Sequence, residues 1–343
     1  MKAAVLEDWG KMSVREVDVP ELEHGEALVQ VSCAAICGSD VHIFNGKNPI
    51  ARTPVIPGHE FVGKVSKLAS PNSSISIGSR VVVQPLKFCG ECRPCKRGLQ
   101  HVCENLIVIG VNQNGGFAQY VRVPADTLIE IPADMPDEVA VLTEPFSIGY
   151  HTCKRGGLED GQRALVIGGG PIGLYAALVA RELGSRDVVI SEPISDRREK
   201  IESLGLTAVD PLKEGCLQQL WDRSEGDGYD LVIETSGVDA GINFAVEACA
   251  IRGNIVTLGF PGDNFAKYNV TRGIVKELSL IGSRVCPRDE FRETLDLLQT
   301  LYKRGDIDFS RLVSLPRSLE RLGHSISDVG AGNESAKILI KPE

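Results

Sequence analysis

The chain has 343 residues, which is long enough for two domains of ordinary size. It carries 37 Lys and Arg against 46 Asp and Glu, a net charge of −9, and aromatic residues make up only 5%. This balance argues against a nucleic-acid partner, because nucleic-acid-binding proteins present basic surfaces and aromatic stacking platforms. Hydrophobic residues at 43% and charged residues at 24% are typical of a globular protein and exclude an intrinsically disordered one.

The sequence also argues against a membrane protein. Its longest uncharged run, 164–180, is short and is interrupted by glycines and Pro171. The first residues reach Glu7 and Asp8 before any continuous apolar run, unlike a secretory signal peptide. We therefore expect a cytoplasmic protein with no membrane partner, in which the ten cysteines serve thiol or metal chemistry and not a disulfide framework.

Short β runs broken by Gly, Pro, Asn and Asp fill the first 145 residues. Examples are ALVQVSCAAIC (27–37), EFVGKVSKLA (60–69), SRVVVQP (79–85) and GFAQYVRV (116–123). Such a pattern predicts a small antiparallel, barrel-like domain.

Apolar strands then alternate with helical stretches between Gln162 and Ser283. The strand-like runs are ALVIG (164–168), DVVIS (187–191), DLVIETSG (230–237), NIVTLG (254–259) and LSLIGS (278–283). The helical runs are IGLYAALVARELG (172–184) and AGINFAVEACAIRG (240–253). This alternation predicts βαβ units and a parallel sheet.

The C-terminal part lacks this alternation. Phe291, Leu295, Leu298 and Tyr302 share one helical stripe that stops at Gly305. The chain then closes with a strand-like KILIKP (337–342). We expect this tail to rejoin the first domain.

A glycine-rich motif, GGGPIG (168–173), directly follows one of the strand-like runs and opens a helix. Glycines at these positions let the backbone turn sharply and approach a pyrophosphate at the helix N-terminus. An acid, Glu192, ends the next strand, where it can bond the ribose hydroxyls and repel a 2′-phosphate, so NAD is favoured over NADP. Arg197 and Arg198 follow closely. They are either solvated charges on the following helix or positive charges that weaken the preference for NAD. The residues assigned to cofactor binding are Gly168, Gly170, Pro171, Ile172, Gly173, Glu192 and Arg197.

Four cysteines follow the pattern C-x2-C-x2-C-x7-C over residues 89–103. Four thiolates at this density close a tetrahedral zinc site, which is a structural and not a catalytic arrangement. A zinc ribbon that binds nucleic acid separates two cysteine pairs by a longer segment. The predicted structural zinc ligands are Cys89, Cys92, Cys95 and Cys103.

A looser set of metal-binding residue types lies in CGSDVH (37–42), GHE (58–60) and the pair Glu144–Pro145. Cys, His and Glu are all zinc ligands, and three protein ligands leave a position open for substrate. Spacing alone leaves other readings open: a core thiol at Cys37, a core histidine at His59, and surface acids at Glu60 and Glu144.

These motifs together resemble the zinc-containing medium-chain alcohol dehydrogenase superfamily, in its sorbitol and threonine dehydrogenase branch. The resemblance covers the whole chain and rests on CGSDVH, PGHEFVGKV, CGECRPCKRGLQHVC, TEPFSIGYH and GGGPIG in this order. It implies an α/β protein with a GroES-like, β-barrel-type catalytic domain formed by residues 1–145 and 288–343, with a structural zinc lobe at 89–103. A Rossmann NAD-binding domain with a doubly wound parallel sheet is implied for residues 146–287.

The resemblance also implies roles for individual residues. Cys37, His59 and Glu60 match catalytic zinc ligands, and Glu144 matches a glutamate that lies near or on the metal. The other implied roles are a proton relay through Ser39 and His42, a carboxylate that holds the ligating histidine at Asp40, and a contact near the nicotinamide at Arg284.

We therefore expect two zinc ions per chain, NAD, and hydride transfer from a secondary hydroxyl of a small hydroxylated substrate. The resemblance favours a sugar acid, such as L-galactonate or L-gulonate oxidised at C5, and a homodimer or homotetramer. Alternatives are a polyol or threonine dehydrogenase, a zinc-free reductase on the same fold, and a zinc-ribbon binding protein. A substrate carboxylate needs a cation, for which the candidates are Lys47, Arg52, Lys87 and Arg284.

Overall fold

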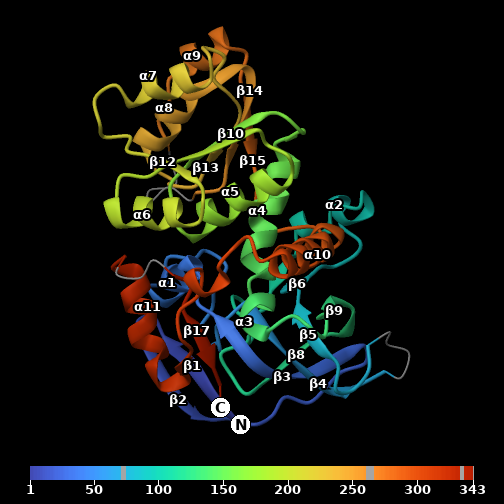
Figure 1. Cartoon of the computed structure of the whole chain (residues 1–343). Helices are drawn as coiled ribbons and strands as arrows, with labels where there is room; N and C mark the ends of the chain where they lie inside the picture. Colours follow the sequence, from blue (N-terminus) through green and yellow to red (C-terminus); the bar gives the residue numbers. More distant parts are fainter. Residues whose placement is uncertain (71–74, 260–265, 333–335, 343) are drawn as a thin grey trace. The chain divides into compact units, whose positions relative to one another are not determined.

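A computed structural model describes residues 1–70, 75–259, 266–332 and 336–342 (Figure 1). The chain divides into two compact units. The first, here called the discontinuous unit, comprises Met1–Glu144 and Pro287–Glu343, and the second, the central unit, comprises Pro145–Cys286. Among the described residues, no helix combines the length and the apolar character needed to span a membrane.

A seven-stranded sheet forms the framework of the discontinuous unit, in the order β16-β17-β3-β4-β5-β9 with β8 also paired to β3. All its pairings are antiparallel except β16 with β17. The C-terminal strand β17 pairs with β3, so the C-terminal segment lies in the same unit as the N-terminal residues. The strands are β3 (Glu26–Ala35), β4 (Glu60–Leu68), β5 (Arg80–Val83), β8 (Tyr120–Pro124), β9 (Leu128–Glu130), β16 (Arg317–Ser318) and β17 (Leu339–Lys341).

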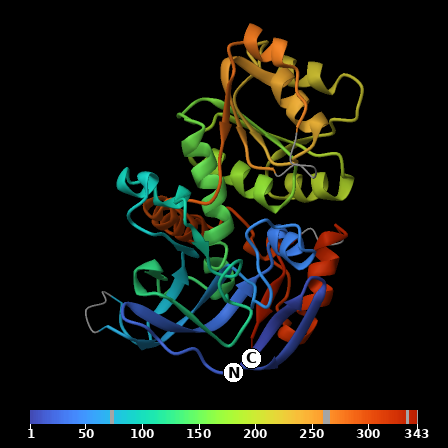
Figure 2. The same ribbon diagram turned by 180° about the vertical axis from the view of Figure 1, so that it is seen from behind.

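Smaller elements surround this sheet. The hairpin of β1 and β2 lies beside α11 in both views (Figures 1 and 2). The stripe predicted after residue 287 is helix α10, which ends at Gly305 in a left-handed conformation (φ 73°). The elements are β1 (Lys2–Asp8), β2 (Lys11–Glu16), α1 (Gly38–Phe44), β6 (Leu86–Lys87), α2 (Arg93–Lys96), β7 (Ile107–Val108), α3 (Asp137–Ala140), α10 (Arg288–Arg304) and α11 (Leu322–Gly330).

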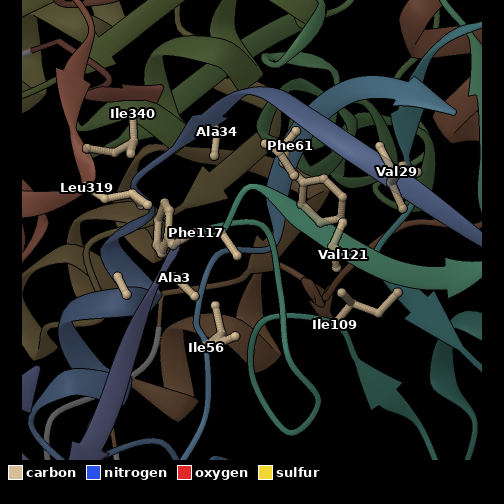
Figure 3. Close-up of a cluster of buried hydrophobic side chains, with 14 of the residues drawn as sticks. Ala3, Val29, Ala34, Ile56, Phe61, Ile109, Phe117, Val121, Leu319 and Ile340 are labelled. Carbon is tan, nitrogen blue, oxygen red and sulfur yellow. The ribbon is translucent and has the colours of Figure 1, made fainter. Parts of the chain in front are cut away.

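The core of the discontinuous unit joins both ends of the chain. Figure 3 shows Phe61 of β4 and Phe117 of the loop before β8 among aliphatic side chains. Ala3 of the first strand and Ile340 of the last are both fully buried in the same cluster. Because burial of apolar surface is the main favourable term in folding, this cluster fixes the C-terminal segment against β3.

The central unit contains six parallel strands in the order β12-β11-β10-β13-β14-β15. Helices α5 and α6 lie on one side of this sheet and α7 and α8 on the other (Figure 1). This is the doubly wound α/β arrangement that the sequence predicts. Helix α4 (Thr143–Arg155) begins at the end of the discontinuous unit and continues into the central unit. The other elements of the central unit are β10 (Arg163–Ile167), α5 (Pro171–Glu182), β11 (Asp187–Ser191), α6 (Ser195–Ser203), β12 (Thr207–Val209), α7 (Cys216–Arg223), β13 (Tyr229–Glu234), α8 (Asp239–Ala248), β14 (Cys249–Thr257), α9 (Val270–Val275) and β15 (Ser279–Gly282).

One predicted helix ends early. The run 240–253 is expected to be helical, but α8 stops at Ala248 and β14 begins at Cys249. Lys276 Nζ donates hydrogen bonds to the carbonyl oxygens of Val246, Glu247 and Cys249 at 2.7–3.0 Å. These bonds occupy carbonyls that have no partner within the helix, so a lysine distant in sequence stabilises this helix end.

Candidate metal and cofactor sites

Three predicted ligands meet in the discontinuous unit. Cys37 precedes α1, and His59 and Glu60 lie where β4 begins. One ligand atom from each lies within 4.8 Å of the other two. His59 is 7% exposed and Glu60 is fully buried. A thiolate, an imidazole and a carboxylate at this separation form a donor set that fits zinc, so they are not the separate core and surface residues that spacing alone leaves open.

Asp40 connects two of these residues. Its Oδ2 accepts a hydrogen bond from the backbone N–H of Cys37 at 2.8 Å, which closes the first turn of α1. Its Oδ1 lies 3.6 Å from His59 Nδ1. Burial lowers the pKa of His59, but the negative charges of Asp40 and Cys37 outweigh it and hold that pKa well above 6.5.

A glycine loop fixes the backbone in front of His59. Gly58 has a φ of 99°, and its carbonyl accepts a hydrogen bond from Gly116 N–H at 2.8 Å. A Cβ on Gly115 would lie 2.2 Å from that carbonyl oxygen, and a Cβ on Gly110 would lie 2.3 Å from the same peptide. Only glycine permits this backbone-to-backbone packing.

Lys337 enters the same cluster from the C-terminal segment. Its Nζ donates to Glu60 Oε1 at 2.7 Å, and the two side chains are 3% and 0% exposed. The sequence gives no signal for this contact, because nothing in the spacing of KILIKP relates it to the histidine motif. Lys337 is therefore a site residue that the sequence analysis missed.

Glu144, in the first turn of α4, is 8% exposed. Its pKa is raised to about 7, mainly by burial; Glu60 and Asp40 also act to raise it, whereas His59 and Lys337 act to lower it. Glu144 therefore lies within electrostatic range of the cluster, although the three-residue ligand group does not include it. Direct metal binding by Glu144 stays a prediction.

The two residues of the predicted proton relay lie on α1. Ser39 Oγ is 3.4 Å from His59 Nε2, so this hydroxyl belongs to the cluster. His42 is exposed and follows Ser39 by three positions, which places both on one face of the helix. The relay itself stays a prediction.

The four clustered cysteines also converge. Their four Sγ atoms all lie within 4.8 Å of one another, and none of these cysteines forms a disulfide. Cys103 Sγ is 3.5 Å from Cys89 Sγ and 3.8 Å from Cys92 Sγ. Corners of a tetrahedron with ~2.3 Å zinc–sulfur bonds are ~3.8 Å apart, so these sulfurs fit a zinc ion. Backbone N–H groups of Glu91 and Cys92 lower the pKa of Cys89 to about 6, which favours its thiolate.

The glycine-rich loop of the central unit has the shape that the motif predicts. Gly168 has a φ of 100°, and a Cβ on Gly173 would lie 1.9 Å from the Gly168 carbonyl oxygen. Gly170 is the N-cap of α5 and Pro171 its first residue, while Ile172 follows in the first turn. The N–H groups at the start of a helix have no carbonyl partner within that helix, so this turn forms a site for a pyrophosphate.

Glu192 is held beside this loop. Its carboxylate accepts hydrogen bonds from the backbone N–H groups of Gly169 at 2.6 Å and Ile194 at 2.9 Å, and the residue is 2% exposed. Arg197 Nη1 lies 3.8 Å from Glu192 Oε2, and Arg198 pairs with Asp210 at 3.2 Å. Both arginines are therefore engaged and are not free solvated charges.

The four cations predicted to bind a substrate carboxylate are all exposed, and none of them forms an ion pair with another described residue. They are Lys47, Arg52 and Lys87 in the discontinuous unit and Arg284 in the loop after β15 of the central unit.

Three features define the class of this protein as a zinc-type, nicotinamide-dependent dehydrogenase. They are a dinucleotide-binding loop on a doubly wound sheet, a Cys-His-Glu group with three protein ligands, and a group of four cysteines. Residues 23–133 match the alcohol dehydrogenase GroES-like domain, and residues 171–300 match the zinc-binding dehydrogenase domain. The chain belongs to the zinc-binding alcohol dehydrogenase family, and the resemblance stated from its motifs is confirmed.

Two sequence relatives illustrate the range of substrates in this family. A 2-dehydro-3-deoxy-L-galactonate 5-dehydrogenase from Pseudoalteromonas atlantica is 32% identical over 92% of both chains. An L-threonine 3-dehydrogenase from Idiomarina loihiensis is 36% identical over 95% of this chain and 94% of its own.

Two solved structures carry nicotinamide cofactors. A protein assigned as a zinc-binding dehydrogenase from Sinorhizobium meliloti 1021, bound to NADP, is 33% identical over 99% of both chains with a TM-score of 0.91. A structure named as a short chain alcohol dehydrogenase from Escherichia coli CFT073, complexed with NADH, is 30% identical over 100% of this chain and 99% of its own, with a TM-score of 0.89. The protein is an oxidoreductase that acts on hydroxyl groups of small molecules.

Proposed function

We propose that this protein oxidises a secondary hydroxyl of a sugar acid or polyol to a ketone and transfers the hydride to NAD. The observation that carries the proposal is the convergence of Cys37, His59 and Glu60 in a buried cluster that Glu144 borders. In this proposal residues 1–145 and 288–343 form the catalytic domain and residues 146–287 the cofactor-binding domain.

Cys37, His59 and Glu60 would hold the catalytic zinc, with Glu144 near it, and the four clustered cysteines would hold a structural zinc. The catalytic ion supplies Lewis acidity that lowers the pKa of a substrate hydroxyl. Asp40 keeps the His59 ring oriented through its contact with Nδ1 and so leaves Nε2 available as the donor atom.

Ser39 and His42 would remove the substrate proton. The Ser39 hydroxyl lies at the metal cluster, accepts the proton and passes it toward the exposed His42 imidazole. Histidine suits the outer position because its ordinary pKa lies near neutrality. Glu192 and the glycine-rich loop would fix the adenosine end of the cofactor, and Arg284 would contact its nicotinamide end.

The proposed preference for NAD rests on the Glu192 carboxylate. Two backbone donors hold its charge beside the glycine-rich loop. A 2′-phosphate in this place would face a buried negative charge, which is unfavourable even though Arg197 at 3.8 Å offsets part of it.

A sugar acid is the proposed substrate class for two reasons. The pocket would be bordered by the acidic groups Glu60 and Glu144, which suits a substrate with several hydroxyls better than an apolar alcohol. Of the relatives above, one acts on a sugar acid and another on threonine, and both substrates carry a carboxylate. Lys47, Arg52, Lys87 or Arg284 would bind that carboxylate.

The test is NAD reduction measured with L-galactonate and L-gulonate, the matching neutral hexitols, and L-threonine. A hexonate should be favoured over its hexitol at least ~10-fold in kcat/KM, about 1.4 kcal/mol, if a cation binds the carboxylate. A hexitol or threonine used better than every hexonate would overturn the sugar-acid proposal and leave the zinc dehydrogenase assignment intact.

We propose that the protein forms a homodimer or homotetramer in which two copies pair through the edge strand β15. This strand ends the six-stranded sheet, and its sequence SLIG carries no charge and no proline, the usual protections of an exposed edge. Leu280 is 49% exposed, and Val270 and Ile274 on the neighbouring α9 are 52% and 71% exposed. A second copy pairing antiparallel across a two-fold axis covers this apolar edge. Sedimentation of Leu280→Lys should show a monomer where the unmodified protein is dimeric or tetrameric; a monomeric unmodified protein would overturn the proposal.

A further inference from the structure

Lys337 and Glu60 form a buried ion pair between segments 277 residues apart. The backbone of Lys337 is fixed on both sides: its N–H donates to Leu312 O at 2.8 Å, and its carbonyl accepts from Ser314 N–H at 2.9 Å. Glu60 is fixed by its pairing with Ala35 in β3, and Ala35 also pairs with Leu339 of β17. The two side chains therefore approach each other from β4 and from the segment just before β17, and these two strands lie on either side of β3.

The two carboxylate oxygens of Glu60 have different surroundings. Oε1 accepts the hydrogen bond from Lys337 Nζ at 2.7 Å. Oε2 is buried and has no hydrogen-bond partner among the described residues. An ionised carboxylate with a bare buried oxygen is costly unless another group binds that oxygen.

We propose that Lys337 is a positioning residue that turns Glu60 into a one-oxygen metal ligand by occupying Oε1 and leaving Oε2 for the ion. This inference rests on the proposed role of Glu60 as a metal ligand. The ammonium group also supplies a positive charge beside the buried Glu60 carboxylate, which offsets the cost of burying that charge.

A purely structural ion pair predicts something different. It would contribute to the free energy of unfolding without changing how the cluster binds a metal. Positioning of Glu60 predicts that removing the lysine head changes metal affinity at this cluster and leaves the four-cysteine cluster unaffected, because groups behind a ligand orient it.

The test uses cobalt, whose visible absorption reports the ligands of the site. Dipicolinate is used to strip the open site of the full-length protein while the four-cysteine site keeps its zinc, and Co²⁺ is titrated in. A Cys37→Ser variant identifies the absorption that belongs to this site. Lys337→Met removes the charge, Lys337→Arg keeps it, and Lys341→Met is the matched control, because Lys341 forms a half-exposed surface pair with Glu138 at 3.0 Å.

We expect Lys337→Met to bind Co²⁺ about 10- to 100-fold more weakly and with an altered spectrum. Lys337→Arg should bind more tightly than the methionine variant, and Lys341→Met should match the unmodified protein. If Lys337→Met does not fold, Lys337→Gln is titrated in its place with the same expected loss. A variant that lacks the Lys337 ammonium group but keeps the Co²⁺ affinity and absorption spectrum of the unmodified protein would overturn the inference. If the unmodified protein itself binds no Co²⁺ at this site, the proposed function fails as well.

Discussion

Asp40 Oδ1 lies 3.6 Å from His59 Nδ1, and both atoms are buried and have no hydrogen-bond partner among the described residues. The other oxygen of Asp40 accepts the N–H of Cys37 at 2.8 Å. One carboxylate therefore holds two proposed metal ligands, one by its side chain and one by its backbone.

Replacing this carboxylate should loosen the metal. Asp40→Asn keeps the shape but loses the negative charge that faces His59, so retention of the catalytic zinc should fall about 10- to 100-fold. The measurement is zinc content after dialysis against a weak chelator. Asp18→Asn, at an exposed position, is the control, and equal zinc retention in both variants would contradict the role of Asp40.

The two metal sites should differ in lability. Four thiolates close one site, whereas the Cys37–His59–Glu60 site keeps an open position, so mild chelation should abolish activity while circular dichroism stays unchanged. Cys95→Ser should lower the thermal stability or solubility, unlike Cys216→Ser outside the cluster. A metal content of one ion per chain with activity that survives chelation would exclude the catalytic zinc.

Glu192→Ala should narrow or invert the preference for NAD. The substitution removes charged hydrogen bonds to the ribose, a loss of about 1 to 3 kcal/mol, and also the repulsion of a 2′-phosphate. The ratio of kcat/KM with NAD and with NADP measures both effects, with the exposed Glu199→Ala on α6 as control. Equal or better use of NADP by the unmodified protein would show that Arg197 outweighs the acid.

Ser39→Ala and His42→Ala should each lower turnover by roughly 10² to 10⁴ while NAD affinity stays nearly constant, because only proton removal is impaired. Stopped-flow rates between pH 6 and 9 test this effect, and the exposed His324→Ala serves as control. Normal turnover of both variants across this range would leave a structural serine and a surface histidine as the better account.

Gly115→Ala should displace the His59 ligand, although Gly115 itself is not one of the proposed metal ligands. The added Cβ would lie 2.2 Å from the Gly58 carbonyl oxygen, so the peptide that precedes His59 must shift, at a cost of about 1 to 3 kcal/mol. Thermal unfolding and zinc retention should both fall. Gly323→Ala, where a Cβ meets nothing within 4 Å, should leave both unchanged, and the same result for Gly115→Ala would refute the packing argument.

Local sequence determined much of this protein. The glycine-rich loop, the clustered cysteines and the α10 stripe ending at Gly305 depend on neighbours a few positions apart, since backbone conformation and short-range spacing are set within one turn or loop. The alternation of strands and helices likewise determined the doubly wound sheet.

Contacts between distant segments needed the folded chain. Lys337 reaches Glu60 only because β17 and β4 both pair with β3, and no spacing between residues 60 and 337 encodes that pairing. The early end of α8 depends in the same way on Lys276, which supplies three hydrogen bonds from outside the helix. A buried charge is stable only beside its partner, and tertiary packing chooses which distant residue that partner is.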